Sequence, residues 1–199
     1  MPRHKDSDKE DILNETRALL LRAATEEFAR EGFKGANINR ISRNAGFAKG
    51  TIYNYFASKR TLMLALIDNI AADHREFMSK NVRQEENPVR RLELFFEAGF
   101  AWVTDNLAQG LVLFTTLNGP DAEFKVSMYE AYLPMFELVS QDILLVGIEQ
   151  GVFRQVEPVS TAALIMNIYL GTGSQVNEGG EQWFPASQVS DFCLKALQV

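Results

Sequence analysis

The stretch GFAKGTIYNYFASKRTL, residues 46–62, decides the fold, because it places a short aromatic segment inside a basic window. Three aromatic residues fall within four positions, and Lys49 and Lys59 stand on either side of them. Residues 32–60 contain six Lys and Arg side chains and no Asp or Glu. A cationic, acid-free window in an acidic chain indicates a surface that binds a polyanion.

The net charge of −6 is unevenly distributed along the 199 residues. Residues 1–60 hold 12 Lys and Arg against 8 Asp and Glu, whereas residues 61–199 hold 8 against 18. This asymmetry is typical of a polyanion-binding end joined to a body that repels polyanions. A window of this length can also lack acids by chance, so composition alone leaves nucleic-acid binding as one of two open interpretations.

The overall composition is that of a globular protein in a reducing compartment. Hydrophobic residues make up 46% of the chain, which argues against disorder. The N-terminus is charged, and no uninterrupted apolar run reaches the roughly 18 residues that a membrane span needs. Cys193 is the single cysteine, so no internal disulfide is possible and we expect a cytoplasmic protein with no membrane partner. Two histidines and one cysteine cannot build the usual transition-metal site, and no cofactor is expected.

Helical periodicity runs through almost the whole chain, and strand signals are nearly absent. We therefore predict an all-α protein of about nine helices, preceded by a disordered tail over residues 1–9. The expected helices cover about residues 10–30, 37–44, 49–56, 58–80, 122–150, 158–176 and 186–197, with a further apolar helical stripe over 92–107. Pro134 should kink or split its helix near Tyr132, because proline lacks an N–H and clashes with the preceding turn.

Residues 37–56 have the shape of a helix-turn-helix, with a turn at Gly46 between two short helices. Ile52 and Phe56, four positions apart, should place one face of the second helix on the core. A short helix that enters the major groove of DNA reads bases mainly from its N-terminal residues. The cation and hydroxyl groups at that end also suit phosphate contacts, which position a protein on DNA.

The sequence from Gly32 to Leu62, GFKGANINRISRNAGFAKGTIYNYFASKRTL, resembles the DNA-binding signature of TetR-type bacterial transcriptional regulators. The resemblance covers about residues 10–65. Two departures are Asn37, where the family often has Thr, and Phe47-Ala48, where Val and Ser are commoner. Ala48 therefore lacks a hydroxyl group that could cap the recognition helix or touch a phosphate.

The resemblance implies a three-helix DNA-binding head over residues 10–57 and a helical ligand-binding and dimerisation domain over residues 58–199. It implies a regulator, most often a repressor, that binds a near-palindromic operator as a homodimer and is released by a small hydrophobic effector. The implied DNA-binding residues are Asn37, Arg43, Lys49, Gly50, Thr51, Tyr53, Asn54, Tyr55 and Lys59. Glu26, Glu27 and Arg60 are expected to be solvated surface, whereas Arg40 is left open between a DNA contact and a solvated position.

The second half of the chain is rich in aromatic and Met residues that suit an apolar ligand pocket. The expected pocket residues are Phe96, Phe100, Phe114, Tyr132, Met135, Phe136, Met166 and Tyr169, with Glu97, His74 and Asn167 as candidate polar groups. Side chains of the last two helices can form an interface with two-fold symmetry. The expected interface residues are Leu164, Ile168, Gly171, Val189 and Phe192. Cys193, on the same segment, is expected to be a small buried hydrophobe.

Two other classes of function are alternatives to a ligand-responsive regulator, namely an architectural or partner-binding protein and an enzyme. An architectural or partner-binding protein of the same fold would use the same head on DNA and take no small effector, and its aromatic cluster would pack solid. An enzyme is disfavoured, because no nucleophile–base set, phosphate-binding glycine loop or paired-carboxylate motif is present.

Overall fold

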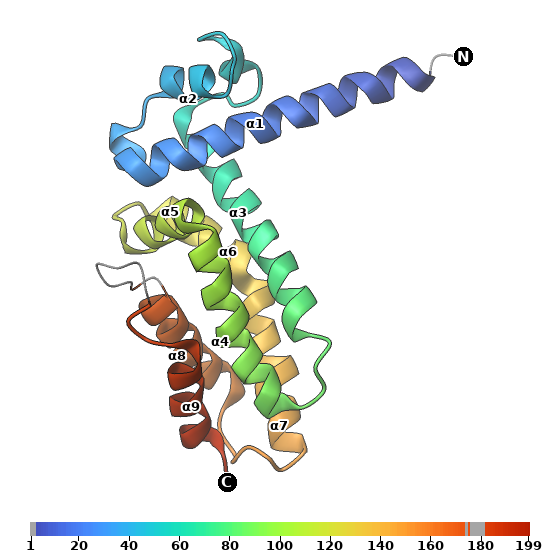
Figure 1. The fold of residues 1–199 in the computed structure, drawn as a ribbon, viewed down its shortest axis with the longest axis vertical. Coiled ribbons are helices and arrows are strands. Elements are labelled where there is room, and N and C mark those ends of the chain that lie inside the picture. Colours follow the sequence, from blue (N-terminus) through green and yellow to red (C-terminus); the bar gives the residue numbers. More distant parts are fainter. Residues whose placement is uncertain (1–2, 174, 176–181) are drawn as a thin grey trace.

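The computed structural model describes residues 3–173, 175 and 182–199, and these are helical almost throughout (Figure 1). A small head of N-terminal helices sits at one end of an elongated helical bundle, and the C-terminus lies at the opposite end. An isolated antiparallel bridge joins Phe153 to Gln198 near that end. The all-α architecture predicted from the periodicity is confirmed.

The head begins with α1 (Arg3–Gly35), which runs across the top of the molecule and projects beyond it (Figure 1). The helix starts at Arg3 and not near Glu10, so residues 3–9, expected in a tail, extend it. This N-terminal segment contains neither Gly nor Pro, and nothing interrupts a helix growing back from the packed end. Regular helix ends at Gly32, whose φ of +64° suits glycine, as predicted.

The helix-turn-helix consists of one regular α-helix and one short 3₁₀ turn. The first, α2 (Ile38–Asn44), is capped by the Asn37 side chain, as predicted. The second was expected to be a helix over residues 49–56, but it is a single 3₁₀ turn, η1 (Thr51–Asn54). Its sequence consists of β-branched, aromatic and Asn residues, all of low helix propensity, which explains why no full helix forms.

The helix α3 (Lys59–Val82) leads out of the head and down the side of the bundle (Figure 1). Ser58 caps it in a capping box with Thr61. The next helix, α4 (Pro88–Asp105), starts with proline in its first turn, and Asn87 caps it. A break at Asn106 then separates α4 from α5 (Leu107–Asn118), although the sequence pattern continued through this point.

The rest of the bundle is formed by α6 (Ala122–Glu137), η2 (Leu138–Leu145), α7 (Val146–Glu149), α8 (Pro158–Gly173) and α9 (Ala186–Leu197). Asp121 caps α6, and Gly151 follows α7 with a φ of +71°. The predicted end of α8 near residue 176 lies outside the described residues.

Pro134 was predicted to kink or split its helix. It does not split the helix, because α6 continues through Pro134 to Glu137. Arg75 of α3 donates a hydrogen bond to the Ala131 carbonyl in the turn before the proline. Beyond α6 the hydrogen-bond register widens into the π-helix η2. The turn before Pro134 is thus bonded to a side chain of the neighbouring helix α3.

The continuous run from Ala122 to Glu149 is, within the described residues, the one helix long and apolar enough to cross a membrane. Its most apolar window includes two acids at most, which is why no uninterrupted apolar run appeared in the sequence. In the structure this run packs against α3 and α8, and 39% of its most apolar window is buried.

The buried side chains form two clusters, one under the head and one in the bundle. The head cluster contains the predicted inward residues Ile41, Ile52 and Phe56, but it also takes in Trp102 of α4 and Phe124 of α6. The core of the head therefore continues into the body, and the two parts share buried apolar surface.

Candidate functional site

The outer face of the helix-turn-helix exposes most of the residues that the sequence assigned to DNA contacts. Arg43, Lys49 and Asn54 are exposed, as is Gly50, and the Tyr53 side chain is 54% exposed. Arg43 and Lys49 make no ion pair and no side-chain hydrogen bond with any described residue. The face therefore presents two cations whose charge is not neutralised by a neighbouring carboxylate.

The other predicted contact residues are partly engaged inside the head. The Asn37 side chain accepts hydrogen bonds from the backbone of α2, at Asn39 and Arg40. The Lys59 ammonium group donates to the carbonyl oxygens of Lys34 and Ala36, at 3.1 and 3.0 Å. These side chains stabilise the ends of the head helices, which leaves them less free for a partner.

Thr51 and Tyr55 are half-buried. The Tyr55 ring packs against the apolar cluster of the head. Its ring therefore has a structural role, and only its hydroxyl group is a candidate for contact with another molecule.

A buried carboxylate that the sequence analysis missed holds α2 onto α1. The Glu27 side chain is 0% exposed, although it was expected to be solvated surface. It accepts hydrogen bonds from Arg40 at 2.7 and 2.6 Å, from the Asn37 N–H at 2.8 Å and from Arg30 at 2.6 Å. Burial raises the pKa of this carboxyl, but the Arg40 and Asn37 hydrogen bonds outweigh it and hold the pKa below its usual value. Arg40, which the sequence left open between a DNA contact and a solvated position, has its guanidinium group committed to this pair.

Another arginine, which was expected on the surface, instead bridges the head and the body. Arg60, in the first turn of α3, pairs with Asp121 at 2.7 Å and with Glu123 at the start of α6. Its guanidinium group also lies 4.7 Å from the ring centroid of Phe124. The hydrogen bond to Asp121 raises the pKa of Arg60, so the pair stays charged.

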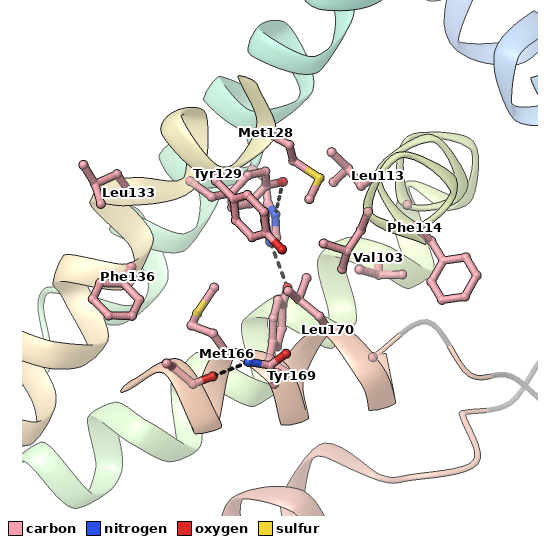
Figure 2. Close-up of a pocket in the computed structure, with 17 residues that line it drawn as sticks. Val103, Leu113, Phe114, Met128, Tyr129, Leu133, Phe136, Met166, Tyr169 and Leu170 are labelled. Carbon is pink, nitrogen blue, oxygen red and sulfur yellow. Dashed lines mark hydrogen bonds between the residues drawn. The ribbon is translucent and has the colours of Figure 1, made fainter. Parts of the chain in front are cut away.

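The body encloses a cavity of about 360 Å³ between α3, α4, α5, α6 and α8. Figure 2 shows Val103, Leu113 and Phe114 on one side, Leu133 and Phe136 of α6 on another, and Met166, Tyr169 and Leu170 rising from α8. The lining residues are His74, Val103, Gly110, Leu113, Phe114, Leu117, Met128, Tyr129, Tyr132, Leu133, Phe136, Ala163, Met166, Asn167, Tyr169, Leu170 and Gly173. This size and this mostly apolar lining suit a small hydrophobic ligand.

One polar network interrupts the apolar wall of this cavity. The His74 ring lies between two phenols, with Nδ1 3.0 Å from the Tyr132 hydroxyl oxygen and Nε2 3.0 Å from that of Tyr169. The imidazole ring also stacks on Trp102, with ring centroids 4.1 Å apart. Burial lowers the pKa of His74 to about 3, so the ring is neutral at pH 7. Burial also raises the pKa of both phenols, so they keep their protons.

Of the eight residues expected to line a pocket, five line this cavity and three do not. Five of the expected pocket residues line it, namely Phe114, Tyr132, Phe136, Met166 and Tyr169. Phe96 and Phe100 lie in the core of the bundle instead, and Met135 lines a second, smaller cavity. Of the candidate polar groups His74 and Asn167 line the cavity, whereas Glu97 pairs with Arg90 at 2.9 Å on another face of α4. Arg90 and Glu97 are seven residues apart, which is two helical turns and the same face of a helix. This spacing could have indicated that they pair.

The last two helices leave apolar side chains uncovered in the protomer. Leu164 of α8 and Phe192 of α9 are each 66% exposed. Ile168 and Gly171 continue the face of α8, while Val189 is buried in the bundle core and is unavailable to a partner. Cys193 is buried beside Val189, and burial raises the pKa of its thiol to about 11, as suits a core residue.

A family model described as bacterial regulatory proteins, tetR family, matches residues 20–66, from the second half of α1 through the first turns of α3. The chain belongs to the TetR family. The HTH-type transcriptional repressor KstR2 of Mycobacterium tuberculosis is 27% identical to it over 146 residues, which cover 71% of this chain and 71% of that protein. The resemblance read from residues 32–62 is thereby confirmed.

Solved structures share the fold of this TetR-family chain over most of its length. The transcriptional regulator FadR from Bacillus subtilis, in complex with stearoyl-CoA, has a TM-score of 0.78 at 20% identity, covering 89% of this chain and 95% of that one. AibR, in complex with isovaleryl coenzyme A and operator DNA, has a TM-score of 0.73 at 17% identity, covering 92% and 98%. At such identities these structures establish the common fold and nothing finer.

Proposed function

We propose that this TetR-family regulator is a homodimeric, cytoplasmic repressor that binds a near-palindromic operator and is released by a small hydrophobic effector. It acts by binding DNA and ligand and not by catalysis. The head over residues 10–57 would bind the operator, and residues 58–199 would bind the effector and the second subunit.

The observation that carries the proposal is the pair of unneutralised cations on the helix-turn-helix face. Two arginines of the head, Arg30 and Arg40, are engaged with the carboxylate of Glu27, whereas Arg43 and Lys49 are engaged with none. Phosphate contacts are made by such free cations and supply most of the salt-dependent affinity for DNA. The AibR complex with operator DNA, which has the same fold, supports this assignment.

The effector part of the proposal is supported by the cavity. A solidly packed aromatic cluster would have favoured an architectural or partner-binding protein, whereas the bundle holds a cavity of about 360 Å³ with apolar walls. FadR and AibR, two proteins of this fold, hold stearoyl-CoA and isovaleryl coenzyme A, and both ligands include an acyl chain. A hydrophobic effector with an acyl-like portion is therefore the class that we propose for this chain.

Dimerisation is supported by the uncovered apolar face of α8 and α9. Leu164 and Phe192 would pack against the same residues of a second copy across a two-fold axis. A two-fold dimer is also what the head needs, since two helix-turn-helix units read half-sites about one turn of DNA apart, roughly 34–36 Å.

The DNA-binding assignment is tested by substituting Lys49 and measuring binding to a duplex selected from a random pool, over a series of salt concentrations. Lys49→Ala should weaken binding and reduce the slope of log affinity against log salt by about one. The matched control is Lys80→Ala, because Lys80 is an exposed lysine paired with Glu76 on the far part of α3.

Tyr55→Phe is a second test, chosen over alanine because the Tyr55 ring packs on the head core. It removes the hydroxyl group alone and should weaken binding with little change in stability. If Lys49→Ala, Tyr55→Phe and Lys80→Ala all bind the selected duplex like the parent protein at every salt concentration, the proposed DNA-binding face is wrong.

A further inference from the structure

The polar network on the cavity wall, formed by Tyr132, His74 and Tyr169, has one more hydrogen-bond donor than it can use. We propose that the effector carries an uncharged hydrogen-bond acceptor, such as a carbonyl group, and that this network donates one hydrogen bond to it. The inference rests on the proposed function, because it concerns the ligand of the same cavity, and it specifies the chemistry of that ligand.

A proton count gives the surplus donor. A neutral imidazole ring has one N–H donor and one acceptor nitrogen, and each of the two phenols has one O–H donor. The two nitrogens of His74 bond one to each phenol. Two bonds use two of the three donors, so one phenol donates to His74 and the other accepts from it.

The accepting phenol keeps a free O–H group whichever tautomer is present. Within the described residues neither phenol oxygen makes another hydrogen bond. Both tyrosines line the cavity, and Figure 2 shows Tyr169 pointing from α8 into it. A buried donor without a partner is costly, so an acceptor brought in by a ligand gains a hydrogen bond that the protein alone does not complete.

The charge of the lining argues that this acceptor is neutral. No Lys, Arg, Asp or Glu is among the described lining residues. Arg75, one residue from His74, lines a separate small cavity and bonds to the Ala131 carbonyl. A carboxylate placed against the network would be buried with a single O–H donor and no cation, which is far less favourable than a carbonyl.

The other polar lining groups do not replace the network. Tyr129 and Asn167 are exposed, so water satisfies them, and the Asn167 amide already donates to the Ala163 carbonyl at 2.7 Å. The network is the polar group on the enclosed part of the wall, where a ligand acceptor is shielded from water and a hydrogen bond counts most.

The same proton count dictates the variant for the test. Replacing one tyrosine by Phe removes one donor and one internal bond together, so a surplus donor remains at the vacated position. The triple variant His74→Phe/Tyr132→Phe/Tyr169→Phe removes every donor and every acceptor of the network. It keeps the aromatic shapes and the stack on Trp102, and replacing all partners of a polar network by apolar groups of similar shape is nearly neutral for stability.

The experiment measures binding of three probes of equal carbon number, methyl heptyl ketone, nonane and nonanoate, by equilibrium dialysis at pH 7. In the parent protein the ketone should bind more tightly than nonanoate. In the triple variant the affinity for the ketone relative to nonane should fall about tenfold, the loss expected for one hydrogen bond. An infrared difference spectrum of carbon-13-labelled ketone should show its carbonyl stretch at lower frequency in the parent protein than in alkane solvent.

The outcomes separate this inference from the proposed function. Probes that bind with an unchanged ketone-to-nonane ratio and an unshifted carbonyl band would overturn the inference and leave the cavity as a hydrophobic effector site. Binding of none of the three probes to the folded parent protein would overturn the effector site itself. Tighter binding of nonanoate than of the ketone would also overturn the inference. The infrared measurement on the parent protein decides the matter even if the triple variant does not fold.

Discussion

Replacing the buried carboxylate Glu27 by its neutral isostere should destabilise the protein, because it holds α2 on α1. Glu27→Gln keeps the shape of the side chain and can still accept from the Asn37 N–H, but it loses the charge that Arg40 and Arg30 face. A hydrogen bond to a charged group contributes about 1.5–3 kcal/mol, so we expect a loss of about 2 kcal/mol. For a chain of this length each kcal/mol corresponds to about 2–4 °C, which gives a fall in Tm of about 4–8 °C.

The assay is thermal unfolding at pH 7, with Glu26→Gln as a matched control because Glu26 is the adjacent glutamate and is exposed. That control should change Tm by less than about 1–2 °C, since exposed charges contribute little. Because folding lowers the pKa of Glu27, its contribution is present above the usual glutamate pKa of 4.5 and is lost as pH falls through the lower folded value. The difference between Glu27→Gln and the parent should therefore shrink below pH 4.5. Equal melting temperatures for the two variants at pH 7 would refute the reasoning.

Two further predictions concern the interface and the link between head and body. Phe192→Asp should convert the proposed dimer to a monomer in sedimentation experiments, because it places a charge on the exposed apolar face, and a variant that stays dimeric would place the interface elsewhere. Arg60→Ala should speed amide hydrogen exchange in the first turn of α6, where Asp121 and Glu123 lose their partner. The control Lys195→Ala, which breaks the surface pair with Asp191, should leave exchange in that turn unchanged.

The features that the sequence predicted are those set by residues close together in the chain. Asn37, Ser58 and Asn87 are caps whose side chains bond within three residues, and each begins its helix where predicted. Gly46 and Gly151 stand at positive φ, a requirement that follows from local geometry alone. The fold class was therefore predictable, and so was the helix-turn-helix, whose spacing is also what the family model matches.

The features that the sequence did not predict depend on residues far apart in the chain. Glu27 and Arg40 are 13 positions apart, and Arg60 and Asp121 are 61 apart, so neither pair follows a helical spacing. For that reason Glu27 and Arg60 were assigned to the solvated surface. The cavity was harder still, because whether an aromatic residue lines a space or fills it depends on how α5, α6 and α8 meet. Phe96 and Phe114 both belong to apolar helical segments, yet Phe96 is buried in the core whereas Phe114 lines the cavity and is 43% exposed.

The cavity and the head are connected by the same two helices, which constrains how an effector can release DNA. His74 of α3 bonds to Tyr132 of α6 in the cavity wall, and Arg60 of α3 pairs with Asp121 beside the first turn of α6. The two contacts on α3 are 14 residues apart, or about 21 Å at 1.5 Å per residue. A ligand that changes the separation of α3 and α6 at the His74 network therefore also perturbs the ion pair between Arg60 and Asp121. Arg60 lies close to the helix-turn-helix. A ligand that binds the two states with equal affinity cannot shift them, however tightly it binds.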